Sequence, residues 1–183
     1  MFTNKLLYFI SAFMKCKIIK GEQGQPYLER YMVARWGKNG QHTIFLHRFL
    51  DSDPDTGIHD HPWDSKSFIL AGGYLEKRLV HFKNKSKVIL RDIPAFSFNT
   101  IRKNDFHQII LKEKTPAWTL FYHGERVKHW GFQNYTVNSS DDTINKGEFV
   151  PFKDKTEPTE RWETVAPKGM NSQREKASYI FNK

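Results

Sequence analysis

Hydrophobic and polar residues alternate in many short segments of this chain, and glycine, proline or charged residues separate the segments. The clearest alternation runs from Tyr74 to Phe82, where successive side chains would point to opposite faces of a strand. Further strands are expected at residues 27–36, 42–49, 67–71, 88–90, 96–98, 106–111 and 117–123; residues 149–152 could add another, and residues 138–147 read as a loop. Many short strands with regular turns predict an all-β sandwich or barrel.

The two ends of the chain differ from this pattern. Residues 4–16 predict a short helix, so we divide the chain into a helical segment packed on the barrel (1–20), the barrel itself (21–152) and a charged extension (153–183). The extension either wraps over the domain or stays disordered. The apolar part of the helix is too short to cross a bilayer, and no cleavage site follows it. With Cys16 as the only cysteine, we expect a cytoplasmic protein with no disulfide and no membrane partner.

A histidine pair stands just before the strand expected at residues 67–71. His59 and His61 are one residue apart, so in an extended chain their imidazoles point to the same side and can converge on one ion. A carboxylate three residues on, Asp64, and a histidine from a distant strand, His107, would complete a site of three histidines and one carboxylate.

This arrangement resembles the first motif of the cupin superfamily, in which His-x-His is followed by a Glu and later by a Gly. Here His59 and His61 are followed by Asp64 and Gly72, and His107 fits the histidine of the second cupin motif. The resemblance covers roughly residues 40–125. It implies a double-stranded β-helix (jelly-roll) barrel with the ion inside its mouth. The sequence departs from the family where Asp64 replaces the Glu, and where Pro94-Ala95-Phe96 only echoes the expected Pro-x-Gly.

Three imidazoles and a carboxylate suit a divalent transition metal: Fe(II), which we favour, or Mn(II), Ni(II), Zn(II) or Cu(II). Asp64 could instead cap a strand or orient a ligand histidine. Glu76 is then the rival carboxylate. It shares a strand face with Tyr74 and Arg78, and if that face points inward the three would act as acid or base, hydroxyl donor and anion clamp. If it points outward, it is a solvated face.

Other residues could line a substrate pocket. Trp63 either packs the metal loop or forms an aromatic rim, and His123, at the end of a strand, could reach the barrel mouth. Arg102, close before His107, is either a loop charge or a clamp for a carboxylate or phosphate. The remaining histidines are expected to be structural or exposed.

The charge balance adds a partner class. The chain has 29 Lys and Arg against 20 Asp and Glu, and many of the basic residues lie between residues 77 and 87. This indicates either a solvated hairpin or attraction for an anionic molecule. No nucleic-acid module, glycine-rich phosphate loop, Gly-x-Ser-x-Gly elbow or cysteine pair is recognisable.

Together these features predict a metal-dependent cupin enzyme, an Fe(II) dioxygenase-type oxygenase acting on a small anionic or aromatic molecule. Two alternatives remain open. In one, the metal acts as a Lewis acid for an isomerase or hydrolase, and Glu76 or Tyr74 handles protons. In the other, the protein is a non-catalytic module that binds an anionic ligand such as a nucleotide. Sheet edges could also pair two copies into a homodimer.

Overall fold

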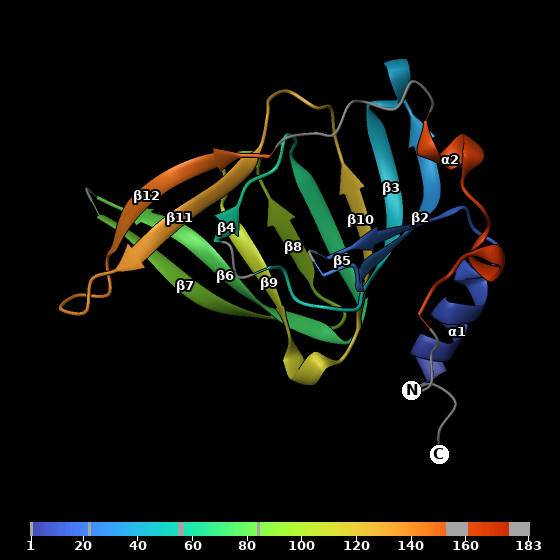
Figure 1. The fold of residues 1–183 in the computed structure, drawn as a ribbon, viewed down its shortest axis with the longest axis horizontal. Helices are drawn as coiled ribbons and strands as arrows, with labels where there is room; N and C mark the ends of the chain where they lie inside the picture. Colours follow the sequence, from blue (N-terminus) through green and yellow to red (C-terminus); the bar gives the residue numbers. More distant parts are fainter. Residues whose placement is uncertain (1, 22, 55–56, 84, 153–160, 176–183) are drawn as a thin grey trace.

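Two antiparallel sheets of six strands each form the body of the computed structural model, which describes residues 2–21, 23–54, 57–83, 85–152 and 161–175. They face each other in Figure 1. The first sheet has the order β1 (Cys16–Lys20), β2 (Pro26–Trp36), β3 (His42–Phe49), β10 (Ala117–His123), β5 (Ser65–Ala71) and β8 (Phe98–Ile101). The second has the order β12 (Ile144–Pro151), β11 (Gly131–Val137), β4 (Ile58–His59), β9 (His107–Leu111), β6 (Gly73–Phe82) and β7 (Lys85–Pro94).

The eight strands from β3 to β10 pair in a nested way. Strand β3 pairs with β10, β4 with β9, β5 with β8 and β6 with β7, all antiparallel. Such pairing is that of one long hairpin rolled up so that its strands fall alternately into two sheets, which is a jelly roll. The all-β, double-stranded β-helix prediction is therefore confirmed.

The apolar core lies between the sheets. Leu28, Phe49, Ile69 and Ala117 of the first sheet pack with Tyr74, Ile93, Ile109 and Leu111 of the second. Side chains two residues further along a strand point to the same face. By this rule Arg30, His47 and Thr119 follow the core residues on the first sheet, and Glu76 and His107 follow them on the second. A polar layer therefore lies next to the apolar core inside the barrel.

The predicted N-terminal helix is shorter in the structure. Helix α1 spans Phe2–Ser11, and Cys16 already begins β1, which pairs with β2, so the expectation of a helix to residue 16 is wrong at its end. Leu7, Tyr8 and Met14 pack on the outer side of the first sheet against Tyr31 and Trp118. No helix among the described residues is long and apolar enough to cross a membrane.

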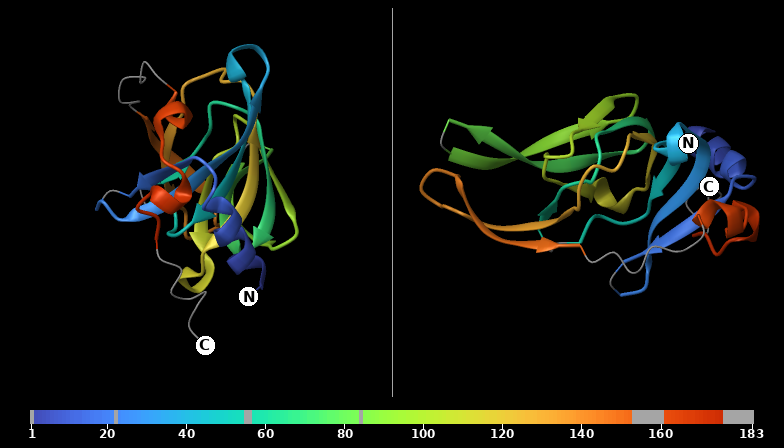
Figure 2. Two further views of the ribbon diagram at one scale, coloured as in Figure 1. Left: turned by 90° about the vertical axis from the view of Figure 1, so that its right-hand side faces the viewer. Right: turned by 90° about the horizontal axis from the view of Figure 1, so that it is seen from above.

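Part of the predicted C-terminal extension is folded. Helix α2 (Trp162–Val165) and a 3₁₀ turn at Gly169–Asn171 lie at the same end of the molecule as α1, as Figure 2 shows. Backbone hydrogen bonds join Gly169 to Met14 and Met170 to Ala12. Two further 3₁₀ turns span Lys38–Gly40 and Lys112–Lys114. The rest of the extension, residues 153–160 and 176–183, lies outside the described residues.

The hairpin of β11 and β12 was not expected. The predicted loop at residues 138–147 is wrong from Ile144 onward, and the strand expected at 149–152 is the end of β12. Seven of the eight β12 residues are exposed, so the strand lacks the alternation that marks a half-buried strand. The short strand β4 was missed because two residues are too few to show a pattern.

The turn between β5 and β6 depends on Gly72. Its φ is +77°, and a Cβ there would lie 2.5 Å from the Pro116 carbonyl oxygen. Gly72→Ala should therefore lower the free energy of unfolding by about 2 kcal/mol or more, since it combines backbone strain with a clash against backbone. Urea unfolding measures the change. Gly124→Ala is the control, because the nearest atoms to its Cβ would be 3.8 Å away; equal effects of the two variants would contradict the prediction.

Candidate metal centre

Three histidines from two neighbouring strands meet inside the barrel. Residue His59 of β4 pairs directly with His107 of β9, and His61 follows two residues on. Each offers a ring nitrogen, and the three nitrogens lie within 4.8 Å of one another. The Nε2 atoms of His61 and His107 are 2.8 Å apart. Two nitrogens bound at right angles to one ion, with bonds of about 2.1 Å, would be about 3 Å apart, so this pair fits a transition metal.

His107 is oriented by Glu76. Its Nδ1 lies 3.1 Å from Glu76 Oε1, so the ring donates to the carboxylate and leaves the Nε2 lone pair facing the other histidines. The Glu76 side chain is fully buried, and Arg78, Arg91 and Asn99 donate to it at 2.9, 3.0 and 2.8 Å. Burial alone would raise its pKa, but the hydrogen bonds from His107, Arg78 and Asn99 outweigh burial and lower the pKa to about 2. Glu76 is thus an ionised group that holds a candidate ligand histidine in place.

Two histidines of the cluster, His59 and His61, are in the neutral form that binds metals. Burial lowers the pKa of His59 to about 4, although Asp53, whose Oδ2 lies 3.9 Å from the His59 Nδ1, acts in the opposite direction. Burial also lowers the pKa of His61 well below its usual value, and His59 and His107 add to this effect. Both rings are therefore neutral at physiological pH, and their nitrogens need not lose a proton before they bind an ion.

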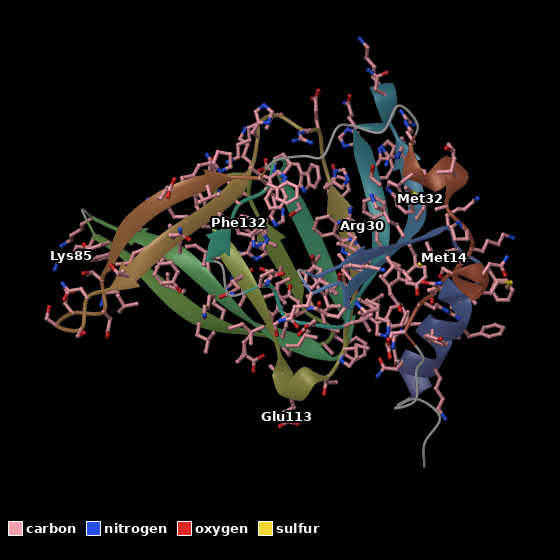
Figure 3. All side chains as sticks on the ribbon, in the orientation of Figure 1. Met14, Arg30, Met32, Lys85, Glu113 and Phe132 are labelled. Atoms are coloured by element: carbon pink, nitrogen blue, oxygen red, sulfur yellow. The ribbon has the colours of Figure 1, made fainter. Side chains whose placement is uncertain are left out.

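Aromatic rings surround the cluster. Trp63 and Trp130 both stack on His61, with ring centroids 6.5 and 6.4 Å away. Phe132 pairs with His59 across strands, with centroids 5.9 Å apart, and Figure 3 shows it beside β4. His123 stacks on Trp63 at 4.2 Å, and burial lowers its pKa to about 4. Sequence reasoning proposed Trp63 and His123 for this region but missed Trp130 and Phe132, because it missed β11.

Two buried aspartates hold the histidine-bearing segment. Asp60 Oδ1 accepts a hydrogen bond from the backbone N–H of Gly131 at 2.9 Å, and Asp60 also pairs with Lys128. Asp53 accepts from the Tyr27 hydroxyl and from the backbone of Ile109. The segment is thereby tied both to β11 and to β9. Residues 55–56, between Asp53 and the histidines, lie outside the described residues.

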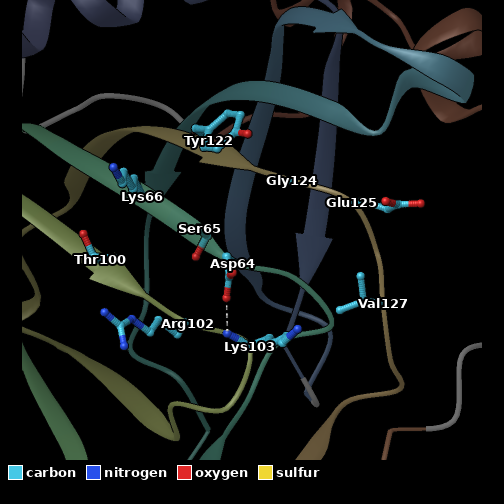
Figure 4. Close-up of a pocket in the computed structure, with 10 residues that line it drawn as sticks. All are labelled: Asp64, Ser65, Lys66, Thr100, Arg102, Lys103, Tyr122, Gly124, Glu125 and Val127. Atoms are coloured by element: carbon cyan, nitrogen blue, oxygen red, sulfur yellow. Dashed lines mark hydrogen bonds between the residues drawn. The ribbon is translucent and has the colours of Figure 1, made fainter.

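Asp64 and Arg102 lie outside the cluster, on the other side of the first sheet. Asp64 is exposed, and its Oδ1 accepts from the backbone N–H of Lys103 at 2.8 Å, as Figure 4 shows. Both line a surface pocket of about 620 Å³ with Lys66 and Tyr122. The neighbouring Ser65 is buried, and adjacent strand residues face opposite ways. The structure thus does not bring Asp64 to the metal cluster as a fourth ligand, nor Arg102 to it as a substrate clamp.

The strand face of Tyr74, Glu76 and Arg78 points inward, so it is not the solvated face that the sequence left open as an alternative. Tyr74 is 1% exposed and lies in the apolar core; its hydroxyl accepts from Asn99 at 3.2 Å, and burial raises its pKa. Arg78 pairs with Glu76 at 2.9 Å and with Asp105 at 3.3 Å. These contacts favour a structural role for Tyr74 and leave Arg78 with its charge already paired.

Comparison with known proteins finds matches only among solved structures, since no protein-family model and no curated protein matches. A cupin-2 domain from Rhodospirillum rubrum is 13% identical, with a TM-score of 0.48 over 70% of this chain and 78% of that one. The hydroxypropylphosphonic acid epoxidase from S. wedmorenis is 17% identical, with a TM-score of 0.43 over 60% and 55%. A recombinant oxalate oxidase in complex with glycolate is 18% identical, with a TM-score of 0.45 over 62% and 59%.

The nested strand order decides the fold independently of these likenesses. This chain has a double-stranded β-helix, or jelly-roll, fold. It spans little more than half the length of the epoxidase and oxidase chains that it matches, at 55% and 59%. A likeness at this level concerns the fold alone, because one fold carries many activities. The activity has to be argued from the residues of the metal centre.

The orienting role of Glu76 can be tested by Glu76→Gln. The amide keeps the size of the side chain but loses the charge that fixes the His107 ring, so metal affinity should fall by about 10- to 100-fold. Competition with a chelator of known affinity measures the change. Glu148→Gln, at an exposed position of β12, is the control. Equal affinities in the two variants would show that Glu76 does not support the centre.

The buried histidines also predict how metal-free protein responds to acid. The pKa values of His47, His59, His61 and His123 are all lowered, so these rings take up protons in the unfolded chain at about pH 6.5 but stay neutral longer in the folded one. Stability should fall from pH 6.5 toward pH 4, by up to about 1.4 kcal/mol per pH unit for each ring. Urea unfolding across this range tests this prediction. In His59→Gln the dependence of the unfolding free energy on pH should be weaker, by an amount that corresponds to about one fewer proton taken up on unfolding.

Proposed function

We propose that this protein is a metal-dependent enzyme in which His59, His61 and His107 hold a divalent transition metal. We favour Fe(II) and an oxygenase-type reaction on a small anionic molecule. The observation that carries the proposal is the convergence of three imidazoles within 4.8 Å, one of them oriented by a buried carboxylate. Such an outer carboxylate is the usual partner of a metal-bound histidine.

The number of ligands supports a catalytic site over a structural one. Structural transition-metal sites are commonly closed by four protein ligands, whereas catalytic sites have three and keep a position open. Here three histidines meet, and Asp64, the expected fourth ligand, faces the outer pocket. A bound ion with open positions supplies Lewis acidity and, as Fe(II), reactivity toward O₂.

The residues around the histidines have separable tasks. Glu76 fixes the His107 ring, and the Trp63, Trp130 and Phe132 rings exclude water from the centre. An isomerase or hydrolase would need a proton carrier in addition. Glu76 is a poor one, because four donors already engage it and its pKa is about 2. Tyr74 is a poor one because its hydroxyl is held by Asn99 inside the apolar core.

A cytoplasmic location belongs to the same proposal, because a reducing compartment would keep both Fe(II) and the buried Cys16 thiol reduced. Pairing of two copies through a sheet edge stays a prediction.

The proposal is tested by metal analysis and O₂ uptake on protein purified without a histidine tag. We expect about one iron per chain, and O₂ consumption with a small carboxylate or phosphonate when Fe(II) is restored to chelator-treated protein. His107→Ala should lose most of the iron and the uptake. The control is His81→Ala, because His81 lies near the exposed tip of the β6–β7 hairpin and contacts Ser86.

Other outcomes would contradict the oxygenase. Zinc or manganese as the resident metal, without O₂ consumption, would support the Lewis-acid alternative. Protein that binds no transition metal, yet still captures an anionic ligand, would support the binding module. Full metal content and activity in His107→Ala would remove the basis of the proposal.

A further inference from the structure

Arg30 points into the barrel interior from the first sheet. It lies on β2 two residues after Leu28, which packs between the sheets against Ile109. The register of β2 against β3 is regular here, so Arg30 faces the same interior. His107 lies two residues before Ile109 on the opposite sheet and faces that interior from the other side. Figure 3 labels Arg30 near the middle of the molecule.

The charge of Arg30 has no anionic partner among the described residues. Its Nε donates to His47 Nε2 at 3.0 Å, and its guanidinium carbon lies 4.9 Å from the centre of the Phe45 ring. The arginines Arg48, Arg78 and Arg91 each pair with a carboxylate instead. Arg30 is partly buried, and this burial lowers the pKa of its guanidinium to about 10.

Two neighbours of Arg30 add buried hydrogen-bond donors. His47 is neutral, because burial lowers its pKa, and its Nε2 accepts from Arg30, so its own proton is on Nδ1. That Nδ1 has no partner within the described part of the chain, and His47 is only 3% exposed. Thr119 stands opposite His47 on β10; it is 1% exposed, and its Oγ1 also lacks a partner there.

This donor patch, defined as Arg30, His47 and Thr119, lies close to the metal centre. His47 and His123 both contact the Phe121 ring, with centroids 4.9 and 6.1 Å away. His123 in turn stacks on Trp63, which stacks on His61. One layer of rings therefore connects the patch to the histidine cluster.

We propose that Arg30, assisted by His47 and Thr119, binds the oxyanion group of the substrate inside the barrel. The patch has one positive charge and two buried donors without acceptors, His47 Nδ1 and Thr119 Oγ1. The Nη1 and Nη2 edge of Arg30 matches two oxygens of a carboxylate or phosphoryl group. The inference rests on the proposed function in one respect: the remainder of the substrate would reach the metal centre. It assigns to Arg30 the clamp that the sequence suggested for Arg78 or Arg102.

The test measures oxyanion binding in metal-free and metal-loaded protein. Glycolate and inorganic phosphate are the probes, followed by calorimetry and by the tryptophan fluorescence of the intact chain. Wild type should bind at least one of them saturably without metal, and the preferred probe separates a carboxylate from a phosphoryl substrate. Arg30→Gln should weaken binding by at least about tenfold, since a charge-assisted, bidentate contact is lost. Its metal content should match that of wild type.

Matched variants keep the result interpretable. Arg102→Gln removes a cation from the outer pocket and should leave binding unchanged. Thr119→Val removes one hydroxyl with little change in volume and should weaken binding several-fold, so the patch can be tested even if Arg30→Gln does not fold. Arg30→Lys should restore part of the affinity, because it keeps the charge but loses the bidentate fork.

The outcomes for the two proposals can be told apart. Wild-type oxyanion affinity in Arg30→Gln, or a loss confined to Arg102→Gln, would overturn the Arg30 assignment and leave the metal centre untouched. Absence of metal from wild type, with oxyanion binding that still depends on Arg30, would refute the proposed enzyme and support the assignment. No saturable binding of either probe by wild type, with or without metal, would overturn the assignment.

Discussion

A carboxylate enclosed between two sheets is costly unless donors surround it, and Glu76 is fully buried. Its four donors come from four different strands: Arg78 from β6, Arg91 from β7, Asn99 from β8 and His107 from β9. Three of these strands belong to the second sheet, and β8 is the edge of the first. The hydrogen bonds that compensate the buried charge therefore also join the two sheets, and one of them fixes the ring of a metal-ligand candidate.

Strand β6 could be predicted from the sequence because its residues alternate between more buried and less buried positions. Strands β3 and β10 are buried along much of both faces and were predicted as apolar segments bounded by turn residues. The His59/His61 pair was also predictable, since spacing by two residues is enough to place both side chains on one side of an extended chain. The position of His107 opposite them depends on the pairing of β4 with β9, which the sequence pattern does not give.

The errors concern residues whose role is set by distant parts of the chain. Asp64 was chosen by its spacing from the histidines, but strand alternation turns it away from them once Ser65 faces inward. Arg30 was missed because a charged residue within a strand is normally read as exposed. Only the position of Leu28 in the inter-sheet core shows that the Arg30 face of β2 points inward. Trp130 and Phe132 were missed because the strand that positions Phe132, β11, has no clear pattern of its own.

The two sheets contribute different chemistry to the same interior. The metal-ligand candidates and their orienting carboxylate lie on β4, β6 and β9 or follow β4, whereas Arg30, His47 and Thr119 lie on β2, β3 and β10. A change in the donor patch need not alter the hydrogen bonds that orient His107, because no hydrogen bond or ion pair of Arg30 reaches Glu76 among the described residues. In the proposed enzyme, substrate recognition can thus vary on the first sheet while metal binding is kept on the second. The polar layer supports both tasks beside an apolar core that packs the two sheets against each other.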